Sequence, residues 1–598
     1  MIPIEALDIA RQFRDVPKQY KNFTVTGYDT ETVGGKCELL ATEGDYIHPN
    51  GMDQILAFLT SKKRRGSIGF FYNLGYDFHA ILKHLPEHKW QEIYHQGKIS
   101  WGEFYELSWI PGKILFIRRK TGSKSRTFPF YDISQFYGRR RLDDVAQEYL
   151  GERKQSHQWD MSNVTPELCR DPLFVKYCRR DAYLAGQLAQ FWIDLCRQMG
   201  VYTKTFASPA SVSSWYFRHK CDIPTINRYR SGKNQLVLHT AWQAVNGPLI
   251  TTYRRGYHEK VYEYDLNSAY PDAIRKLLDL RLGYFVFSRK DEPHPDAFYG
   301  YIRCSVFIFH DSPAWFIPPF PMERKTLSKY CPYGAFETTL TLQEYLTYKD
   351  DYKIRIRHGF YWIPNGVAYP FKSAIEELYQ TRLETSDANI NYFCKIMLNG
   401  FYGKTLEKYK DHESQTIKTG QLFNPFYAAQ ILSACRIKVW KQLRKMKPET
   451  IVATYTDSII STEPLSFDDN KELGAWSYEG AGESLIIGCG VYTNRLNGRI
   501  KTKLRGFHTT SHVDLFDVLR EQHKADFIRI PVTKNIKPLE SLIQGIPDQM
   551  NRIIEDHREI FINFDTKRLW LKGGLKKAGQ LLGASYESVP MLFDTIGV

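Results

Sequence analysis

With 598 residues, the chain is too long for one ordinary domain, and we expect roughly three to five structural units. Hydrophobic residues make up 43% of it and aromatic residues 15%, a composition that excludes a disordered or low-complexity protein. Lys and Arg outnumber Asp and Glu by 81 to 66. The net charge of +15, beside so many aromatic rings, suits a polyanionic partner such as nucleic acid, with an ordinary basic enzyme as the alternative.

The ten cysteines are dispersed, and the closest two, Cys169 and Cys178, are nine residues apart. No CxxC motif exists, which excludes a zinc ribbon or a redox pair and favours a reducing compartment. Acids stand at Glu5 and Asp8, so the N-terminus does not resemble a signal peptide. Because no stretch approaches about 18 consecutive apolar residues, we expect no membrane span and a cytoplasmic location.

The first 200 residues read as alternating strands and helices. The β-branched and aromatic run of 21–32 predicts a strand, and 65–85 predicts a strand, a loop and a helix. Residues 172–198 have the pattern of one long amphipathic helix. This mixture indicates an α/β unit of the kind found in nucleases, with a boundary near Gly200.

The elements beyond Gly200 are of several kinds. A buried strand is expected at 260–266, and the stretch from about 282 to 370, rich in proline and aromatic residues, is expected to form an irregular insertion. The last 70 residues are expected to form a small basic terminal domain. Further predictions are helices at 370–384, 386–403 and 423–446, and a hairpin at 449–463.

Four carboxylates in the N-terminal third form the first candidate constellation. Asp29 and Glu31 lie two apart at a strand end and therefore share one face. Asp77 follows at a strand-to-helix turn, and Asp181 comes one helical turn after Tyr177. Convergent carboxylates can hold two divalent ions for phosphodiester hydrolysis, with Tyr177 orienting the water. Each pattern alone also fits an ordinary turn or helix.

Two acids in the second half form another constellation. Asp265 ends an apolar strand, and Asp457 is placed at the tip of the predicted hairpin. A carboxylate buried among apolar residues is costly unless it meets a cation. Two such acids could clamp two Mg²⁺ ions on the phosphates of a nucleotide.

The helix predicted between these acids presents a polar face. Lys395, Asn399 and Tyr402 share that face by their spacing of four and three residues. Lys395 is a candidate phosphate contact, and Arg382 from the preceding helix is a second. A solvated surface lysine is the alternative.

In this order, the two constellations resemble the six motifs of family B DNA polymerases, closest to the protein-primed branch of phages and linear plasmids. The exonuclease motifs of that family are DxE, Nx2–3(F/Y)D and Yx3D, and its polymerase motifs are DxxSLYP, Kx3NSxYG and YxDTDS. The match runs from Asp29 to about Arg505.

The resemblance implies a multidomain α/β and α+β protein. An N-terminal RNase H-like 3′–5′ exonuclease domain would be followed by a right-hand polymerase of palm, fingers and thumb. The implied boundaries are 1–200 for the exonuclease, 201–281 for the palm with motif A, 282–368 for an insertion, 369–410 for the fingers with motif B, 411–525 for the palm with motif C and 526–598 for the thumb.

The resemblance also implies roles for single residues. Thr32 and Asn73 match positions that hold single-stranded primer ends, and Tyr270 matches the residue that packs under the sugar and rejects a 2′-hydroxyl. The segment Tyr253–Gly256, YRRG, stands where the family has YxGG, a loop that grips the template. Other implied DNA contacts are Tyr402, and Lys503 with Arg505 as a substitute for the KxY motif that grips the primer.

The sequence departs from the family pattern at several positions. Tyr455 stands where motif C has its first Asp, and Gly400 replaces the Ser of motif B. Residues 490–492, GVY, stand in place of KxY. Because the segment between motifs B and C reads mostly as one helix, we expect the second insertion of the protein-primed branch to be short or absent, while the first insertion fits after motif A.

These observations predict a DNA-directed DNA polymerase with 3′–5′ proofreading exonuclease. It would use two Mg²⁺ ions at each active site, with Mn²⁺ as an alternative, and act as a monomer on primer-template DNA and dNTPs. The sequence leaves the kind of primer open: the hydroxyl of a terminal protein, an RNA or DNA end, or none. The alternatives are an exonuclease whose polymerase half does not catalyse and a non-catalytic DNA-binding accessory. Candidate basic clusters along the DNA path are 62–65, 139–141 and Lys572, Lys576 and Lys577, with solvated charge as the other interpretation.

Overall fold

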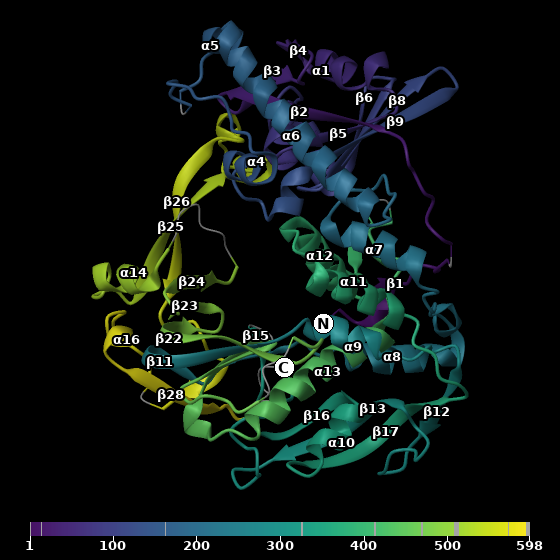
Figure 1. Ribbon diagram of the computed structural model, residues 1–598, viewed down its shortest axis with the longest axis vertical. Coiled ribbons are helices and arrows are strands. Elements are labelled where there is room, and N and C mark those ends of the chain that lie inside the picture. The colour runs from purple at the N-terminus through teal and green to yellow at the C-terminus, as the bar shows by residue number, and fades with distance from the viewer. Residues whose placement is uncertain are drawn as a thin grey trace.

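The computed structural model describes residues 2–13, 15–161, 163–324, 327–411, 414–467, 471–506, 513–571 and 573–593, apart from the side chains of 324–328. An N-terminal sheet with its helices lies at one end of the molecule, and a second large sheet lies toward the other (Figure 1). Helices from the middle of the chain lie between them (Figure 1). Lys572, a member of one predicted basic cluster, lies outside the described residues.

The N-terminal sheet has eight strands in the order β4-β3-β2-β5-β9-β8-β7-β6, and β2 pairs in parallel with β5, as β5 does with β9. The helices α2 and α6 contact it, so the predicted α/β unit is confirmed. The strands are β2 (Thr24–Val33), β3 (Lys36–Ala41), β4 (Tyr46–Ile47), β5 (Ser67–Phe71), β6 (Lys98–Trp101), β7 (Tyr105–Ile110), β8 (Ile114–Thr121) and β9 (Lys124–Asp132). The helices are α1 (Met52–Leu59), α2 (Leu74–Leu82), α3 (Glu87–Gln96), α4 (Leu142–Leu150), α5 (Pro166–Arg170) and α6 (Pro172–Gln198).

Helix α6 approaches strand β2 unusually closely. A Cβ atom on Gly27 would lie 2.0 Å from the carbonyl oxygen of Ala182 and 2.4 Å from the backbone nitrogen of Gly186. Only glycine fits such a contact between backbones. The close approach brings the acids of β2 near the acid of α6.

The segment that precedes this sheet in the chain pairs with a strand from the middle of the chain. Strand β1 (Leu7–Asp8) pairs in parallel with β19 (Ile417–Thr419), and the side chains of Ile4, Leu7 and Ile9 are buried there. The first residues of the expected domain 1–200 thus pair with a strand from the middle of the chain.

The second large sheet contains nine strands. Seven run in the order β10-β20-β21-β11-β22-β23-β24, and β28 pairs with both β11 and β27. The strands β27 and β28 of the expected unit 526–598 thus join this sheet. The strands are β10 (Leu249–Thr252), β11 (Arg254–Leu266), β20 (Ile451–Thr456), β21 (Ser458–Ser461), β22 (Trp476–Gly488), β23 (Val491–Leu496), β24 (Arg499–Leu504), β27 (Arg568–Trp570) and β28 (Ser585–Pro590).

The stretch expected to be irregular forms an ordered sheet, with the order β12-β17-β13-β16. Strand β13 is buried along nearly its whole length, so its sequence lacks the alternation that marks a half-exposed strand. Its elements are β12 (Gly283–Ser288), β13 (Tyr299–Ile308), β14 (Met322–Arg324), β15 (Leu327–Tyr330), β16 (Gly334–Thr341), α10 (Leu342–Tyr348) and β17 (Lys353–Pro364).

The helices predicted in the middle of the chain are confirmed. Between α12 and α13, the described residues form a short hairpin of β18 (Lys408–Lys410) and β19, which fits the expected short second insertion. The helices are α7 (Pro209–Lys220), α8 (Gln235–Gln243), α9 (Ala269–Arg275), α11 (Lys372–Glu384), α12 (Ala388–Lys404) and α13 (Pro425–Leu443).

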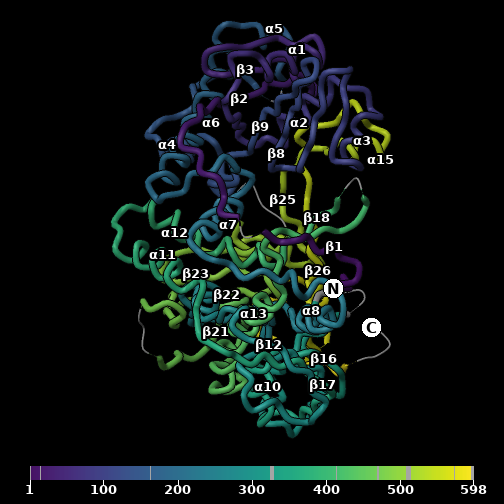
Figure 2. Tube along the Cα trace, turned by 90° about the vertical axis from the view of Figure 1, so that its right-hand side faces the viewer, coloured from purple at the N-terminus to yellow at the C-terminus, as the bar shows by residue number. Residues whose placement is uncertain are grey.

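A long hairpin of β25 (Phe527–Asn535) and β26 (Ile553–Phe561) reaches from the second sheet to the N-terminal one (Figure 1). At its tip, α15 (Pro538–Ile543) packs against α3 (Figure 2). The remaining helices are α14 (Leu515–Glu521) and α16 (Gln580–Gly583). Across the described residues, no helix has the length and apolar character that crossing a membrane requires.

Candidate active sites

The four acids predicted in the N-terminal third come together. Asp29 and Glu31 extend from β2, Asp77 lies in the first turn of α2, and Asp181 lies on α6. Ligand atoms of Asp29, Glu31 and Cys178 lie within 4.8 Å of one another. Glu31, Asp77 and Asp181 are buried and Asp29 is half-buried. The chain therefore gathers several negative charges at a place with little water.

Burial and mutual repulsion oppose the ionisation of these acids. Burial raises the pKa of Asp29 well above its ordinary value, and Asp181 adds to the effect. Burial and then Asp181 raise the pKa of Glu31 to about 8. Burial also raises the pKa of Asp77 to about 8, although the Thr30 hydroxyl donates a hydrogen bond of 2.7 Å to it. Perturbed acids in one cluster are typical of a functional site.

Lys154 is a cation of this site that the sequence interpretation missed. Its Nζ lies 2.5 Å from Oδ2 of Asp181 and 4.9 Å from the centre of the Tyr177 ring. Burial alone would lower the pKa of Lys154, but Asp181 outweighs it and holds the pKa above its ordinary value. Lys154 lies in a polar loop, where a lysine is ordinarily interpreted as a solvent-exposed charge. Nothing in the sequence therefore marked it as part of the site.

The donor set fits divalent ions such as Mg²⁺ and Mn²⁺, which prefer carboxylate oxygens. Oδ1 of Asp181 is buried and has no hydrogen-bond partner among the described residues. The thiol of Cys178 lies 3.5 Å from Oδ2 of Asp29, but burial raises its pKa well above the ordinary value. A thiol with a raised pKa is a poor ligand for such ions, so the carboxylates are the better-suited donors of this cluster.

The residues predicted to hold a single strand lie beside these acids. The hydroxyls of Thr32 and Tyr76 form a hydrogen bond of 2.8 Å. Asn73 has a left-handed backbone with φ of 74°, and its N–H donates to Oδ1 of Asp132 over 3.1 Å. Asp132, also missed, is buried and accepts from the Ser134 hydroxyl as well. It fixes the loop that carries Asn73.

The two acids of the second half also meet. The N–H of Leu266 donates to the carbonyl of Asp457 over 3.0 Å, which sets the end of β11 beside the β20–β21 turn. Burial raises the pKa of Asp265 to about 7, with Asp457 as the next cause and Glu479 after it. Burial also raises the pKa of Asp457. The predicted hairpin and the pairing of its acid with Asp265 are thus present.

A cavity of about 380 Å³ opens at these two acids, lined on one side by cations of β24 and the residue after it. Lys501 lies there, 2.7 Å from Glu263, and its charge lowers the pKa of both Asp265 and Asp457. Lys501 and Glu479 were missed, although the alternation of Lys501, Lys503 and Arg505 along a strand was a usable signal. The cavity residues that bear charge are Glu263, Asp265, Asp457, Glu479, Lys501, Lys503 and Arg505.

Tyr455, in place of the first acid of motif C, has a packing role. Its ring stacks on that of Tyr492, with centroids 4.7 Å apart and an angle of 3° between the planes. Its hydroxyl lies 3.5 Å from Oγ1 of Thr252 on β10. The exchange therefore replaces a charge by an aromatic contact between strands β20 and β23.

The predicted face of α12 forms. Lys395 and Asn399 are exposed on it, and the ring of Tyr402 lies 4.5 Å from that of Tyr270. A Cβ atom on Gly400 would lie 2.6 Å from Cβ of Ser213 on α7, which explains why the family's serine is absent here.

Arg382 on α11 contacts the turn after β11. Its Nη1 donates to Oγ of Ser268 over 3.2 Å, and Asn391 of α12 donates to the Arg382 carbonyl over 3.0 Å. Helices α11 and α12 are thereby tied to the strand that carries Asp265.

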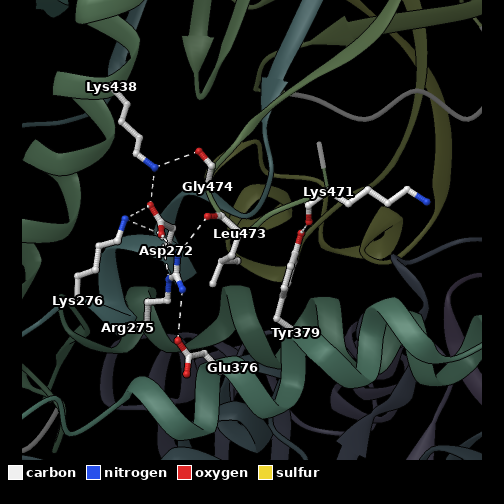
Figure 3. Close-up of polar contacts among 9 residues, drawn as sticks. All are labelled: Asp272, Arg275, Lys276, Glu376, Tyr379, Lys438, Lys471, Leu473 and Gly474. Atoms are coloured by element: carbon white, nitrogen blue, oxygen red, sulfur yellow. Dashed lines mark hydrogen bonds and ion pairs between the residues drawn. The ribbon is translucent and has the colours of Figure 1, made fainter. Parts of the chain in front are cut away.

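An ion-pair cluster fixes α9, the helix after Asp265 (Figure 3). The carboxylate of Asp272 forms ion pairs with Arg275 of its own helix and with Lys276, the residue after that helix. It also pairs with Lys438 of α13 over 2.5 Å. Burial would raise the pKa of Asp272, but the hydrogen bonds from these lysines outweigh it and lower the pKa. Arg275 also pairs with Glu376 of α11 over 3.3 Å, so Asp272 joins α9 to α13, and Arg275 joins α9 to α11.

The prediction for the YRRG segment is corrected. Tyr253 is only 1% exposed, and its ring packs under Arg568 and against Phe316, so its side chain offers no surface to DNA. Gly256 lies in β11, and a Cβ there would lie 2.1 Å from the carbonyl of Ala584. Residues 254–256 of the segment begin β11 and pair with β28, whereas Tyr253 forms the bend between β10 and β11.

Comparisons with known proteins agree with this arrangement. Residues 174–432 match the family model described as DNA polymerase type B, organellar and viral. A DNA polymerase of Acidianus bottle-shaped virus (isolate Italy/Pozzuoli) is 26% identical over 281 residues, which are 45% of this chain, and the match spans only 40% of that relative.

Solved structures show the same fold. Phi29 DNA polymerase complexed with primer-template DNA and incoming nucleotides superimposes with a TM-score of 0.64 at 15% identity, over 92% of this chain and all (100%) of that one. The orthorhombic crystal form of Phi29 DNA polymerase superimposes with a TM-score of 0.63 at 15% identity, over 91% of this chain and 100% of that one.

Proposed function

The chain resembles the family B DNA polymerases, a resemblance that the family model and the viral relative bear out, and from this premise we propose that it is a DNA-directed DNA polymerase with a 3′–5′ exonuclease. One observation carries the proposal: Asp265 and Asp457 meet in a cavity that three cations line. Buried acids facing cations suit a negatively charged substrate held through divalent ions.

At this site, two divalent ions held by Asp265 and Asp457 would supply the positive charge that activates a primer hydroxyl and stabilises leaving pyrophosphate. Lys395 and Arg382 bind the triphosphate of the incoming dNTP. Tyr270 lies under its sugar and selects deoxynucleotides, and its ring packs against that of Tyr402, a proposed DNA contact. Lys503 and Arg505 hold the primer strand, and Lys501 limits repulsion between the acids.

The second site would remove a mispaired 3′ end. Asp29, Glu31, Asp77 and Asp181 would hold two divalent ions, which would supply a nucleophilic water and stabilise the leaving oxygen. Tyr177 orients that water, and Lys154 keeps Asp181 and Tyr177 in place. Thr32 and Asn73 hold the single-stranded end.

The proposed organisation follows the observed modules. The N-terminal sheet is the exonuclease domain, the nine-stranded sheet is the palm, α11 and α12 are the fingers, and the β25–β26 hairpin is the thumb. The proposed partners are primer-template DNA and dNTPs, for a monomer that replicates a phage or mobile-element genome in the cytoplasm of a host. Incubation with a labelled dNTP and one primer at a time, including a terminal protein, would identify the primer.

The two-site proposal is tested by exchanging one acid at each site. Asp457→Asn should abolish primer extension and leave 3′ resection intact, and Asp29→Ala should do the reverse, because each removes an ion's ligand from one site only. Both variants are assayed on one labelled primer-template with Mg²⁺. Loss of both activities in either variant, with the protein still folded, would contradict the assignment.

An exonuclease without polymerase activity is the rival that Tyr455 motivates. Extension assays of the native chain with Mg²⁺ and with Mn²⁺ separate the two. Incorporation with either ion excludes the rival, and resection without incorporation supports it. A non-catalytic DNA-binding accessory would show neither activity.

A further inference from the structure

The tip of the β25–β26 hairpin, residues 536–552, packs on the N-terminal module as if it were part of it. We call this segment the docking tip. Its helix α15 lies against α3 (Figure 2), and Met550 is fully buried in the module's apolar core. A Cβ atom on Gly35, which has φ of +79°, would lie 2.4 Å from the carbonyl of Met550. The contact is therefore a close fit between backbones that only glycine allows.

Lys83 joins the docking tip to the turn between β2 and β3. Its ammonium donates to the carbonyls of Gly34 over 2.6 Å, Asp548 over 2.7 Å and Met550 over 3.0 Å. An ammonium has three N–H donors, and each finds a carbonyl here. Burial lowers the pKa of Lys83 to about 8, which agrees with its partial removal from water.

Asn551 joins the docking tip to the exonuclease motifs. Its side chain is fully buried, and its amide donates to the carbonyl of Tyr76 over 3.1 Å and that of Gly35 over 3.5 Å. The hydroxyl of Tyr76 is the one bonded to Thr32. Asn551 has a left-handed backbone, with φ of 63°, a conformation that persists only when the surroundings impose it.

We infer that the docking tip is a positioning element of the exonuclease site. By holding the β2–β3 turn and the start of α2, it fixes Tyr76, and through the hydrogen bond from Tyr76 it positions Thr32, which holds the single-stranded 3′ end. The inference rests on the proposed exonuclease function. Asn551 and Lys83 are its positioning residues, since neither is one of the predicted metal ligands.

Two variants remove the contacts with little other change. Asn551→Gly tolerates the positive φ and loses the side-chain amide, including the hydrogen bond that its oxygen accepts from Asn535 within the hairpin. Lys83→Met keeps the length of the side chain without its donors. Gln544→Ala, an exposed amide on the same tip, is the matched control. For resection of a single-stranded oligonucleotide, we expect KM to rise roughly threefold to tenfold in both variants, with kcat within twofold. Primer extension should be unchanged, as should both activities of the control.

Hydrogen exchange gives a readout that does not depend on activity. Amides of 33–36 and 73–77 should exchange faster in both variants and not in the control. If the native chain resects but these amides exchange at the native rate in both variants, or both variants keep the native KM, the inference is wrong and the proposed exonuclease stands. A native chain that resects nothing overturns the proposed exonuclease, and the inference with it. If kcat for resection and the rate of primer extension fall together in the variants, the substitutions destabilise the whole protein, and the inference is wrong.

Discussion

At the residue scale, Tyr455 shows how an expected acid can be absent from an otherwise intact site. Its stacking on Tyr492 contributes packing, and its hydroxyl makes only a long contact. Tyr455→Phe should therefore keep primer extension within about threefold and the free energy of unfolding within about 1 kcal/mol. Tyr455→Ala should lower that free energy by about 2–4 kcal/mol. Chemical denaturation and extension rates check both. Loss of extension in the Phe variant would give the hydroxyl a catalytic role.

The raised pKa values of the exonuclease acids predict a pH dependence of stability. Glu31 has a pKa of about 8 in the fold against 4.5 ordinarily, so between these values the folded chain keeps a proton that the unfolded chain has released. The unfolded state then binds fewer protons, and stability falls as pH rises through this range. Thermal unfolding in EDTA should show this fall, with a shallower slope in Glu31→Gln. Added Mg²⁺ should stabilise more at pH 8 than at pH 6, because ionised carboxylates bind it; an equal gain at both would contradict this.

The acids could be predicted from sequence because their spacing fixes their geometry. Asp29 and Glu31 share a strand face, and Asp265 ends an apolar strand, so backbone periodicity alone brings them to the sites. Lys154 could not be singled out, because a lysine in a loop looks the same in the sequence whether it meets solvent or a buried carboxylate. Only tertiary contacts distinguish these cases.

At the element scale, helices α11 and α12 act as one unit through Asn391 and Arg382. Lys395→Ala and Arg382→Ala should each raise KM for dNTP by roughly tenfold or more, since charge-assisted contacts to phosphate contribute about 1.5–3 kcal/mol. Lys372→Ala, an exposed lysine at the start of α11, should leave KM unchanged. Steady-state extension at varied dNTP measures this. An unchanged KM in Lys395→Ala would mean that the lysine is a solvated charge.

The sequence predicted these helices well and the sheet of 283–364 poorly. Helices α11, α12 and α13 have long periodic patterns. Strand β13 is buried almost throughout, and prolines of the following loop obscure the strand pattern. From the sequence, Gly400 is only a mild departure from the motif B pattern. The structure gives the reason for it, because α7 packs directly against this position. Burial on both sides of an element removes the pattern that prediction needs.

At the scale of the whole molecule, some of the basic residues expected to line the DNA path instead contact other residues of the protein. Arg64 lies over the Phe58 ring and bonds Thr42, and Lys63 pairs with Asp45. Solvated or internally paired charge is the better interpretation of the 62–65 cluster. The net charge therefore does not map simply onto a binding surface.

The N-terminal segment connects distant parts of the chain, and its contribution to stability can be measured. Leu7 is buried where β1 pairs with β19, while Phe13, six residues on, is 56% exposed. Leu7→Ala should lower the free energy of unfolding by about 2–3 kcal/mol, because it opens a cavity beside the hairpin that follows α12. Phe13→Ala should change it by less than about 0.5 kcal/mol. Hydrogen exchange at 417–419 should quicken in the first variant only. If both variants behaved alike, β1 would contribute no packing to that hairpin, and the hairpin's position would depend on α12 and α13 alone.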